Sequence, residues 1–467
     1  MGLRLALRVG ARELPRRPPP PHPRRERVEA LQPAPEARPR AALPDGVLIP
    51  VPPFINPLAT RLAARRLDAV RNATDARRVA RGQLPKAIFD YVDGGAEDEI
   101  TLNWNRQAFS DISLAPHGAT WVPDPDLRTT VLGFDLSMPV LTAPCGGMRL
   151  VHPDGDLGIA RAAFEAGTVH VATSASGYSL EEIAKTPGEQ WFQAYRFSNE
   201  QAMQTLVTRA QTAGFGALVA TIDTAVAGNR EKDFRNGFSY NMRINLQNIA
   251  RMAPRMSTRP GWVYRFMRDG MPFELPNTAD LTSDGKPMEL TEMTRTGKDS
   301  HSPSWDDIRW MRSHWDGPLV VKGILTVADA RRAVALGADG IIVSNHGGRQ
   351  LDGAPATMTV LPQIADAVGH AVEILLDSGV RRGSDVIKAR ALGAKAVLVG
   401  RLPSYGLAVA GQSGVSHVLE ILRAEMIRTM RLMGCTTMSA LDPSWLSGAS
   451  APTPTPTAAE LPDLLTR

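Results

Sequence analysis

GIIVSNHGGRQLDG, at residues 340–353, joins a short apolar run to a polar loop that is rich in glycine. Such a run, bounded by a turn signal, predicts a strand that is buried on both faces, as in a parallel sheet. The loop then places His346 and Arg349 three residues apart. Imidazole exchanges a proton near neutral pH, and guanidinium binds a carboxylate through two parallel hydrogen bonds. The stretch therefore predicts a parallel α/β fold with a loop suited to oxidation of, or proton abstraction from, a small carboxylic acid.

Seven more apolar runs of this kind occur from Val140 onward, and segments with helical periodicity lie between them. Strands that alternate with helices predict a parallel sheet, and eight such units predict a closed (β/α)8 TIM barrel, an α/β fold. The other runs are 140–143, 169–172, 191–194, 217–222, 319–322, 374–376 and 396–399, and the helical segments are 157–166, 199–213, 327–336, 384–392 and 415–433.

Polar residues stand at the carboxyl ends of the later runs, which is where barrel enzymes carry their chemistry. Because the carboxyl ends of all eight strands open on one face, we expect these side chains to meet in a single site. In chain order they are Gln193 and Tyr195, Thr221 and Asp223, Lys322, Ser344 and His346, Asp377, and Gly400 with Arg401.

The last two strand ends predict a phosphate site. The segment DSGVRRG at residues 377–383 supplies glycines, a cation and a helix start, so that backbone N–H groups can approach an anion. Gly400 and Arg401 repeat this combination after the eighth run. The chain has no G-x-G-x-x-G nicotinamide fingerprint and no Walker lysine motif, so the predicted phosphate is that of flavin mononucleotide (FMN).

Composition divides the chain into three predicted parts. Residues 1–60 form a proline- and arginine-rich extension, which we expect to be disordered, either as a tail, a targeting segment or sequence upstream of the true start. The main domain spans 66–446, with an insertion at about 235–316, and 447–467 form a loose tail.

Charge and cysteine content limit the possible functions. Residues 1–50 hold ten arginines and five acidic residues, 10 − 5 = +5, which equals the net charge of the whole chain. The remainder is neutral, so the composition does not predict nucleic-acid binding. Two cysteines without metal-ligand spacing predict neither a disulfide framework nor a metal site. Since no run of eighteen apolar residues occurs, no transmembrane helix is predicted.

Two segments resemble a known family. LPKAIFDYVDGGAED at residues 84–98 and the loop at 344–353 are similar to the signatures of the FMN-dependent 2-hydroxy acid oxidases and dehydrogenases, and the resemblance extends to residue 435. It implies an enzyme that binds FMN, oxidises an L-2-hydroxy acid to the 2-oxo acid and assembles as a homo-oligomer, a tetramer.

The resemblance also implies roles for individual residues. His346 is the base beside the substrate, Asp223 pairs with it, and Lys322 faces the flavin and favours its reduced form. Substrate is held by Arg349, Arg230, Tyr91 and Tyr195. The implied cofactor contacts are Pro144, Cys145 and Gly146 after the first run, Thr173, Gln193, Thr221 and Ser344 at the ring, Asp377, Gly379 and Arg381 at the ribose and phosphate, and Gly400 with Arg401 at the phosphate.

Two further features concern substrate and electron acceptor. Ala175 stands where glycolate-specific members of the family have a tryptophan, so a larger acid of the lactate or mandelate type is expected. Residues 259–272 interleave aromatics with arginines, either as a surface that docks on an anionic membrane or as a lid whose small core is Trp262 and Phe266. We favour a cytoplasmic dehydrogenase, peripheral on the inner face of the cell membrane, with a quinone or other membrane acceptor. The alternatives are an oxidase that uses oxygen, a different FMN barrel such as an isomerase, and an FMN-binding protein without turnover.

Overall fold

The computed structural model describes residues 55–195, 200–236, 258–282, 285–289 and 303–447. The predicted extension at 1–60 lies outside these ranges apart from its last residues, where helix α1 (Ile55–Asp68) begins. The predicted tail likewise lies outside them, except that Ser447 pairs with Ser113 in a short sheet. A compact unit that begins at Pro57 contains the barrel and the elements around it.

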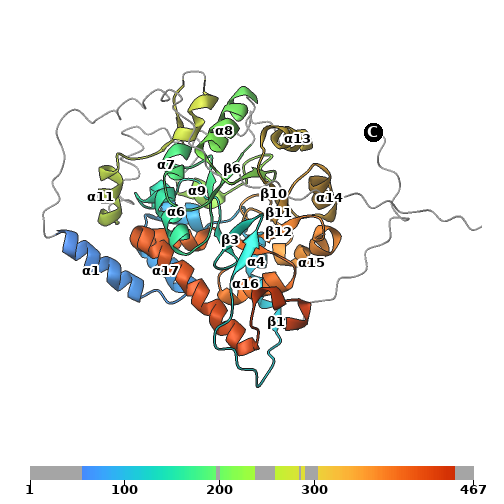
Figure 1. Cartoon of the computed structure of the whole chain (residues 1–467). Helices are drawn as coiled ribbons and strands as arrows, with labels where there is room; N and C mark the ends of the chain where they lie inside the picture. Colours follow the sequence, from blue (N-terminus) through green and yellow to red (C-terminus); the bar gives the residue numbers. More distant parts are fainter. Residues whose placement is uncertain (1–54, 196–199, 237–257, 283–284, 290–302, 448–467) are drawn as a thin grey trace, which may run out of the picture. The chain divides into compact units, whose positions relative to one another are not determined.

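Eight parallel strands close into the predicted TIM barrel (Figure 1). Each apolar run found in the sequence coincides with one barrel strand, with ends that differ by no more than two residues. β10 pairs with β7, the barrel strand before it in the chain, and the ring closes where the last strand, β13, pairs with the first, β4. In chain order the strands are β4 (Val140–Thr142), β5 (His170–Thr173), β6 (Gln190–Ala194), β7 (Ala217–Thr221), β10 (Leu319–Ile324), β11 (Gly340–Val343), β12 (Glu373–Leu376) and β13 (Ala396–Val399).

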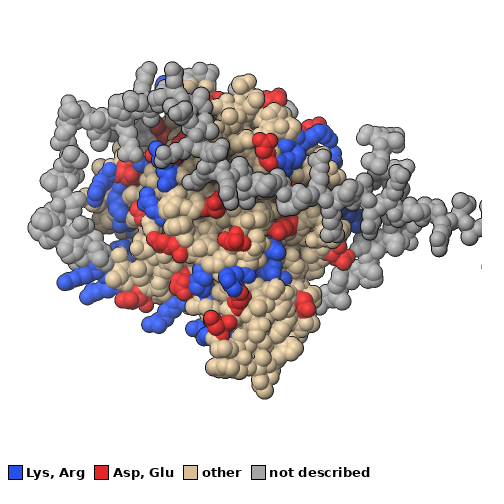
Figure 2. Space-filling view, viewed as in Figure 1, with Lys and Arg blue, Asp and Glu red and all other residues tan. Residues whose placement is uncertain are grey.

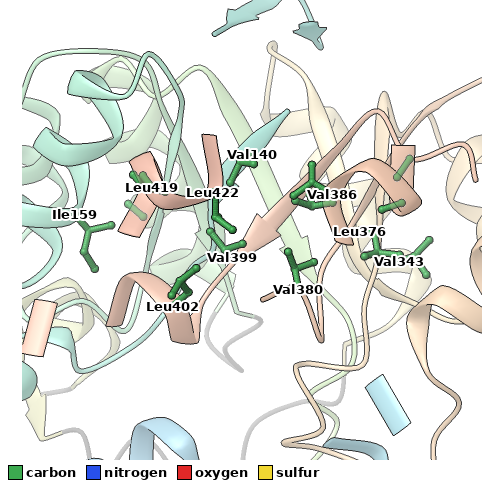
Figure 3. Packing of buried hydrophobic residues seen from close by; sticks show 14 of the residues in the cluster. Val140, Ile159, Val343, Leu376, Val380, Val386, Val399, Leu402, Leu419 and Leu422 are labelled. Atoms are coloured by element: carbon green, nitrogen blue, oxygen red, sulfur yellow. The ribbon is translucent and has the colours of Figure 1, made fainter. Parts of the chain in front are cut away.

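Side chains alternate between the two faces of the barrel wall, as they must in a strand. Leu141, Ile342 and Leu398 belong to one buried cluster, which also contains Trp191 and fills the barrel interior. Their chain neighbours belong to a second cluster, between the strands and the surrounding helices. Figure 3 shows part of that layer, where Val140 and Val399 lie beside leucines of helix α17. Burial on both faces explains why the strands read as continuous apolar runs.

A hairpin covers the amino-terminal end of the barrel. It consists of β2 (Thr129–Val131) and β3 (Phe134–Leu136). The ring of Phe134 meets Trp191 edge-on, with 5.8 Å between ring centroids. Since this end is filled with side chains, the carboxyl ends of the strands are left for a site.

Helices follow most strands. The predicted helix at 415–433 is longer than expected, because α17 spans Arg401–Met433 with non-helical backbone at Ala410 and Gly411. Its first part is buried on all sides, so it carries no amphipathic period that the sequence could reveal. The helices around the barrel are α5 (Met148–Val151), α6 (Gly155–Glu165), α7 (Leu180–Ala184), α8 (Glu200–Ala213), α14 (Val327–Ala335), α15 (Thr357–Val368), α16 (Gly383–Ala391) and α17.

The remaining elements lie before the barrel in the chain, in the connection between β7 and β10, and after α17. In the connection from β7 to β10, where the insertion was predicted, residues 259–272 contain helix α11. Preceding the barrel are α2 (Ala73–Gln83), α3 (Lys86–Asp93), α4 (Ile100–Ser110) and β1 (Ser113–Leu114); the connection from β7 to β10 holds α9 (Glu231–Arg235), α11 (Pro260–Arg268), β8 (Glu274–Leu275), η1 (Pro276–Leu281), β9 (Met288–Glu289) and α13 (Trp305–His314); the end holds η3 (Met438–Ala440), η4 (Pro443–Trp445) and β14 (Leu446–Ser447).

The surface carries both signs of charge. On the face drawn in Figure 2, lysine and arginine side chains are interspersed with aspartate and glutamate. Within the described ranges, no helix has the length and apolar character needed to cross a membrane.

Candidate active site

His346 follows strand β11 in a left-handed backbone conformation, with φ of 59°. Its Nδ1 lies 3.0 Å from Oδ1 of Asp223, which follows strand β7. The hydroxyl of Ser344 accepts a hydrogen bond from the backbone N–H of His346 at 3.1 Å and so helps to hold the turn. With Nδ1 engaged by the carboxylate, Nε2 is the ring nitrogen left to act on a substrate.

Asp223 is set up to remain ionised. Burial by itself would raise the pKa of its carboxyl, but the charges of His346 and Lys322 together hold the pKa below its usual value. A carboxylate in this position stabilises the protonated form of the neighbouring imidazole.

Lys322 is a buried cation at the carboxyl end of β10, and it is only 4% exposed. Its Nζ donates to the hydroxyl of Ser344 at 2.8 Å and lies 3.1 Å from Oδ2 of Asp377. Burial would lower the pKa of the ammonium group, but the carboxylates of Asp377 and Asp223 more than offset this, and the pKa is raised. The site therefore contains a fixed positive charge.

Two guanidinium groups flank the ring of Tyr91, which comes from helix α3. The Cζ atoms of Arg349 and Arg230 lie 5.3 Å and 5.7 Å from its ring centroid. Nη1 of Arg349 donates to the backbone carbonyls of Tyr91 and Gly94. The hydroxyl of Tyr91 donates to the carbonyl of Gly146 at 3.0 Å. These contacts gather two cations and an aromatic ring at one end of the site.

A row of polar side chains crosses three neighbouring strands. Thr173 donates to Oε1 of Gln193 at 2.6 Å, and Nε2 of Gln193 donates to Thr221 at 2.9 Å. All three are buried. The two bonds fix the orientation of the Gln193 amide between its neighbours on β5 and β7.

The loops after β12 and β13 fit the phosphate of FMN. Gly379 has φ of 99°, and a Cβ there would lie 2.4 Å from the carbonyl oxygen of Asn105, so only glycine fits. Arg401 donates to two backbone carbonyls, while its buried Nε has no hydrogen-bond partner in the described part of the chain. Burial, and then the charges of Arg349 and Arg381, lower the pKa of Arg401 to about 9. Clustered, partly buried cations of this kind are suited to an anion with two negative charges.

The thiol of Cys145 and the phenol of Tyr195 are both protonated at neutral pH. Burial raises the pKa of the Cys145 thiol to about 11 and that of the Tyr195 phenol to about 12. Tyr195 is therefore a hydrogen-bond donor in the site, and Cys145 is a neutral, partly buried thiol beside Gly400, where a Cβ would lie 3.1 Å from its sulfur.

A cavity of about 260 Å³ opens among these residues. Of the residues predicted for the site, it is lined by Tyr91, Pro144, Cys145, Gly146, Ala175, Gln193, Tyr195, Thr221, Arg230, Lys322, His346, Arg349, Asp377, Gly379, Arg381, Gly400 and Arg401.

Three predicted residues stand one side chain behind the cavity. Asp223, Thr173 and Ser344 do not line it, but each bonds to a residue that does, namely His346, Gln193 and Lys322. The flavin contacts of Thr173 and Ser344 stay predictions. Lining residues that the sequence analysis missed include Met148, Thr224, Val226, Ala227, Gln350 and Ser404. Thr224 and Gln350 adjoin predicted site residues, and that adjacency was the available signal.

Comparison with known proteins agrees with this geometry. A family model described as FMN-dependent dehydrogenase matches residues 80–448. The chain is 42% identical over 376 residues to (S)-mandelate dehydrogenase of Pseudomonas putida, covering 80% of this chain and 93% of that protein. It is 40% identical over 376 residues to glycolate oxidase 1 of Zea mays, covering 80% and 95%. The crystal structure of the monotopic membrane protein (S)-mandelate dehydrogenase matches with a TM-score of 0.75 and 40% identity, covering 81% of this chain and 99% of that one. The chain therefore belongs to the FMN-dependent dehydrogenase family and is an FMN-dependent 2-hydroxy acid oxidoreductase.

Proposed function

We propose that the protein oxidises an L-2-hydroxy acid larger than glycolate, of the mandelate or lactate type, and passes the electrons to a quinone or another membrane acceptor. The observation that carries the substrate proposal is that the cavity wall at Ala175 is formed by small side chains. Ala175 is 3% exposed and lines the cavity together with Ala143, Val226 and Ala227. Where glycolate-specific relatives place an indole, this wall has a methyl group, which leaves room for a larger substituent on the α-carbon.

The substrate carboxylate is assigned to the end of the cavity that holds Arg349 and Arg230. Arg349 uses backbone carbonyls as partners for Nη1, so no carboxylate of the protein neutralises it in the described contacts. Arg230 lies 3.4 Å from Asp233, but its guanidinium also faces Tyr91 and lines the cavity. Two guanidinium groups at one end orient a carboxylate and thereby place the α-carbon.

His346 is proposed to take a proton from the substrate through Nε2, while Asp223 stabilises the resulting imidazolium. Tyr195 donates a hydrogen bond toward the substrate oxygen, since its raised pKa keeps the phenol protonated. Lys322 holds a positive charge beside the site of electron uptake. FMN, when bound, supplies the chemistry that accepts two electrons from the α-carbon.

The proposal of a membrane acceptor depends on binding of the protein to a membrane, and helix α11 is the proposed contact. Trp262 and Phe266 do not serve as membrane anchors, because they are 4% and 6% exposed and pack on the protein. This inward pair corresponds to the small core predicted for a lid. The outer face of α11 instead presents Tyr264 and Met267, which are 36% and 60% exposed, and Met271, which follows the helix, is 38% exposed. Exposed apolar residues beside an exposed arginine at position 268 suit an anionic membrane surface. A monotopic membrane relative supports the same assignment.

The substrate proposal is tested by mixing the yellow protein anaerobically with L-mandelate, L-lactate and glycolate and following the loss of flavin absorbance. The larger acids should react with higher kcat/KM. Ala175→Trp should reverse the order, because an indole would occupy the space for the substituent, and Ala166→Trp outside the cavity is the control. Glycolate as the preferred substrate of the unaltered protein would contradict the proposal.

The acceptor proposal is tested by sedimentation with vesicles of anionic lipid at low salt. Met267→Asp should reduce sedimentation, whereas Leu432→Asp, at an even more exposed residue of α17, should not. Absence of binding by the unaltered protein would remove the membrane assignment.

A second candidate is an oxidase that uses oxygen, favoured by 40% identity to a glycolate oxidase. Such an enzyme would produce one hydrogen peroxide per substrate in air, whereas a dehydrogenase would need an added quinone for rapid turnover. An FMN-binding protein without turnover would show no loss of flavin absorbance with any 2-hydroxy acid. A homotetramer, implied by family resemblance, stays a prediction that light scattering would test.

A further inference from the structure

We propose that the ion pair between Arg149 and Asp269 positions the cavity wall at Ala175, and that this pair is a determinant of selectivity for substrates with a large substituent. The inference rests on the proposed function, because it concerns the same wall. Arg149 and Asp269 touch neither the cavity nor the predicted cofactor site, so we assign them as positioning residues rather than catalytic ones.

The pair is specific in its geometry. Nε and Nη2 of Arg149 donate to the two carboxyl oxygens of Asp269 at 2.8 and 2.9 Å. The side chains are 12% and 15% exposed, so water screens the pair only weakly. Two parallel bonds between planar groups fix orientation as well as distance.

Asp269 stands at an unusual place for a carboxylate. It is the C-cap residue of helix α11, where its N–H donates to the carbonyl of Arg265. Negative charge at the carboxyl end of a helix is unfavourable, because the helix dipole is negative there. The positive charge of Arg149 offsets this unfavourable interaction, so the ion pair explains why an aspartate is found at position 269.

Arg149 connects that helix to the segment that carries Ala175. Its Nη1 donates to the carbonyl of Gly177 at 3.2 Å, and its Cζ lies 4.4 Å from the centroid of the Tyr178 ring. The backbone at Gly177 approaches so closely that a Cβ there would lie 2.9 Å from Cβ of Arg149. A displaced Arg149 would therefore release the chain two residues beyond Ala175.

The loop before Arg149 reaches the same wall from the other side. The N–H of Gly147 donates to the carbonyl of Ala175 at 3.2 Å. A Cβ on Gly146 would lie 2.9 Å from Cβ of Ala175, so the two segments are in tight contact. Met148, the residue before Arg149, lines the cavity. Arg149 thus connects both segments of this wall to α11.

Helix α11 is held in place by contacts other than the ion pair. The indole N–H of Trp262 donates to the carbonyl of Leu150 at 2.8 Å, next to Arg149 in the chain. Trp262 stacks on Phe266 with ring centroids 4.7 Å apart. The helix is therefore attached to α5 near both of its ends, by Trp262 at one and by Asp269 at the other.

The test uses the full-length protein loaded with FMN and two ligands that cannot be oxidised, phenylacetate and acetate. Each is titrated while the visible flavin spectrum is recorded. Asp269→Asn should weaken phenylacetate binding about tenfold and acetate binding less than twofold, because only the larger ligand needs the wall in place. Arg149→Lys keeps the positive charge but loses the planar fork, so it should give the same pattern. Asp126→Asn removes a carboxylate from a comparable but exposed pair with Arg128 and should change neither constant.

The affinity for FMN, measured by fluorescence quenching, should remain unchanged in Asp269→Asn and Arg149→Lys. Equal weakening of both ligands, or no weakening of either, would overturn the assignment of the pair. If the unaltered protein binds phenylacetate more tightly than acetate but fails to oxidise L-mandelate, the proposed function fails, and the pair is still judged from the two binding constants.

Discussion

Replacement of Asp223 by asparagine isolates one electrostatic contribution to the proposed chemistry. Nδ1 of His346 lies 3.0 Å from the carboxylate, and asparagine can still accept that hydrogen bond. The substitution therefore keeps the orientation of the imidazole while it removes the negative charge. It should slow proton removal from the substrate, because the imidazolium that forms loses its counter-charge.

The size of the effect follows from the distance. Two unit charges 3.0 Å apart attract by about 5 kcal/mol at an effective dielectric constant of roughly 20. The amide dipole of the asparagine retains part of this attraction, and the positive charge of Lys322 also acts on the site. We therefore expect a net loss of about 3 kcal/mol in transition-state stabilisation. This corresponds to a rate of flavin reduction lower by roughly a hundredfold.

The assay is anaerobic stopped-flow measurement of flavin absorbance at saturating L-mandelate. Asp339→Asn, which removes a carboxylate from an ion pair with Arg312 outside the site, serves as the matched control. The FMN affinity of Asp223→Asn should equal that of the unaltered protein, since Asp223 does not line the cavity. A reduction rate within threefold of the unaltered protein would refute the assignment of Asp223 as the counter-charge.

Three further outcomes are expected. His346→Gln should lower the rate of flavin reduction by at least about a hundredfold and leave the visible spectrum of bound FMN unchanged; an undiminished rate would remove His346 from catalysis. Lys322→Met leaves Asp377 without a cation 3.1 Å away and should lower the free energy of unfolding by about 3 to 5 kcal/mol, measured with urea, while Lys322→Met/Asp377→Asn should regain stability but not FMN affinity. Burial raises the pKa of Asp156 from 3.8 to about 7, so the stability contributed by its neutral carboxyl is complete below about pH 4 and is lost as the pH rises to about 7. Asp156→Asn should therefore gain about 3 kcal/mol relative to the unaltered protein between about pH 5 and pH 8, and a gain independent of pH would contradict this reasoning.

Much of the barrel was predictable because its strands are buried on both faces. A run such as Ile341 to Val343 has no room for a polar residue on either side, so the strand is visible as a short apolar segment. The first half of α17 was not predictable for the same reason. Leu402, Leu407 and Ala408 point to different sides of the helix, yet all three are buried, so no helical period distinguishes the segment from a strand or a buried loop.

The site was predictable to the extent that its residues follow strand ends. His346, Lys322 and Asp377 could be assigned to one region because barrel topology brings the carboxyl ends of all strands together. The positions of Thr173 and Ser344 behind the cavity were not predictable, since residue spacing does not reveal whether a polar side chain bonds to a ligand or to its neighbour.

The barrel follows from the amino-acid sequence alone, through the alternation of apolar runs with helical segments, and so does the set of chemical groups at its carboxyl end, through the residues that follow each run. The packing of whole elements sets which face of α11 is buried, with Trp262 inward and Met267 outward. It alone also brought Arg149 to Asp269, which lie 120 residues apart in the chain. The physical reason is that a strand or helix is selected by the local pattern of side chains, whereas a contact between distant residues depends on how whole elements pack, and no local pattern encodes that.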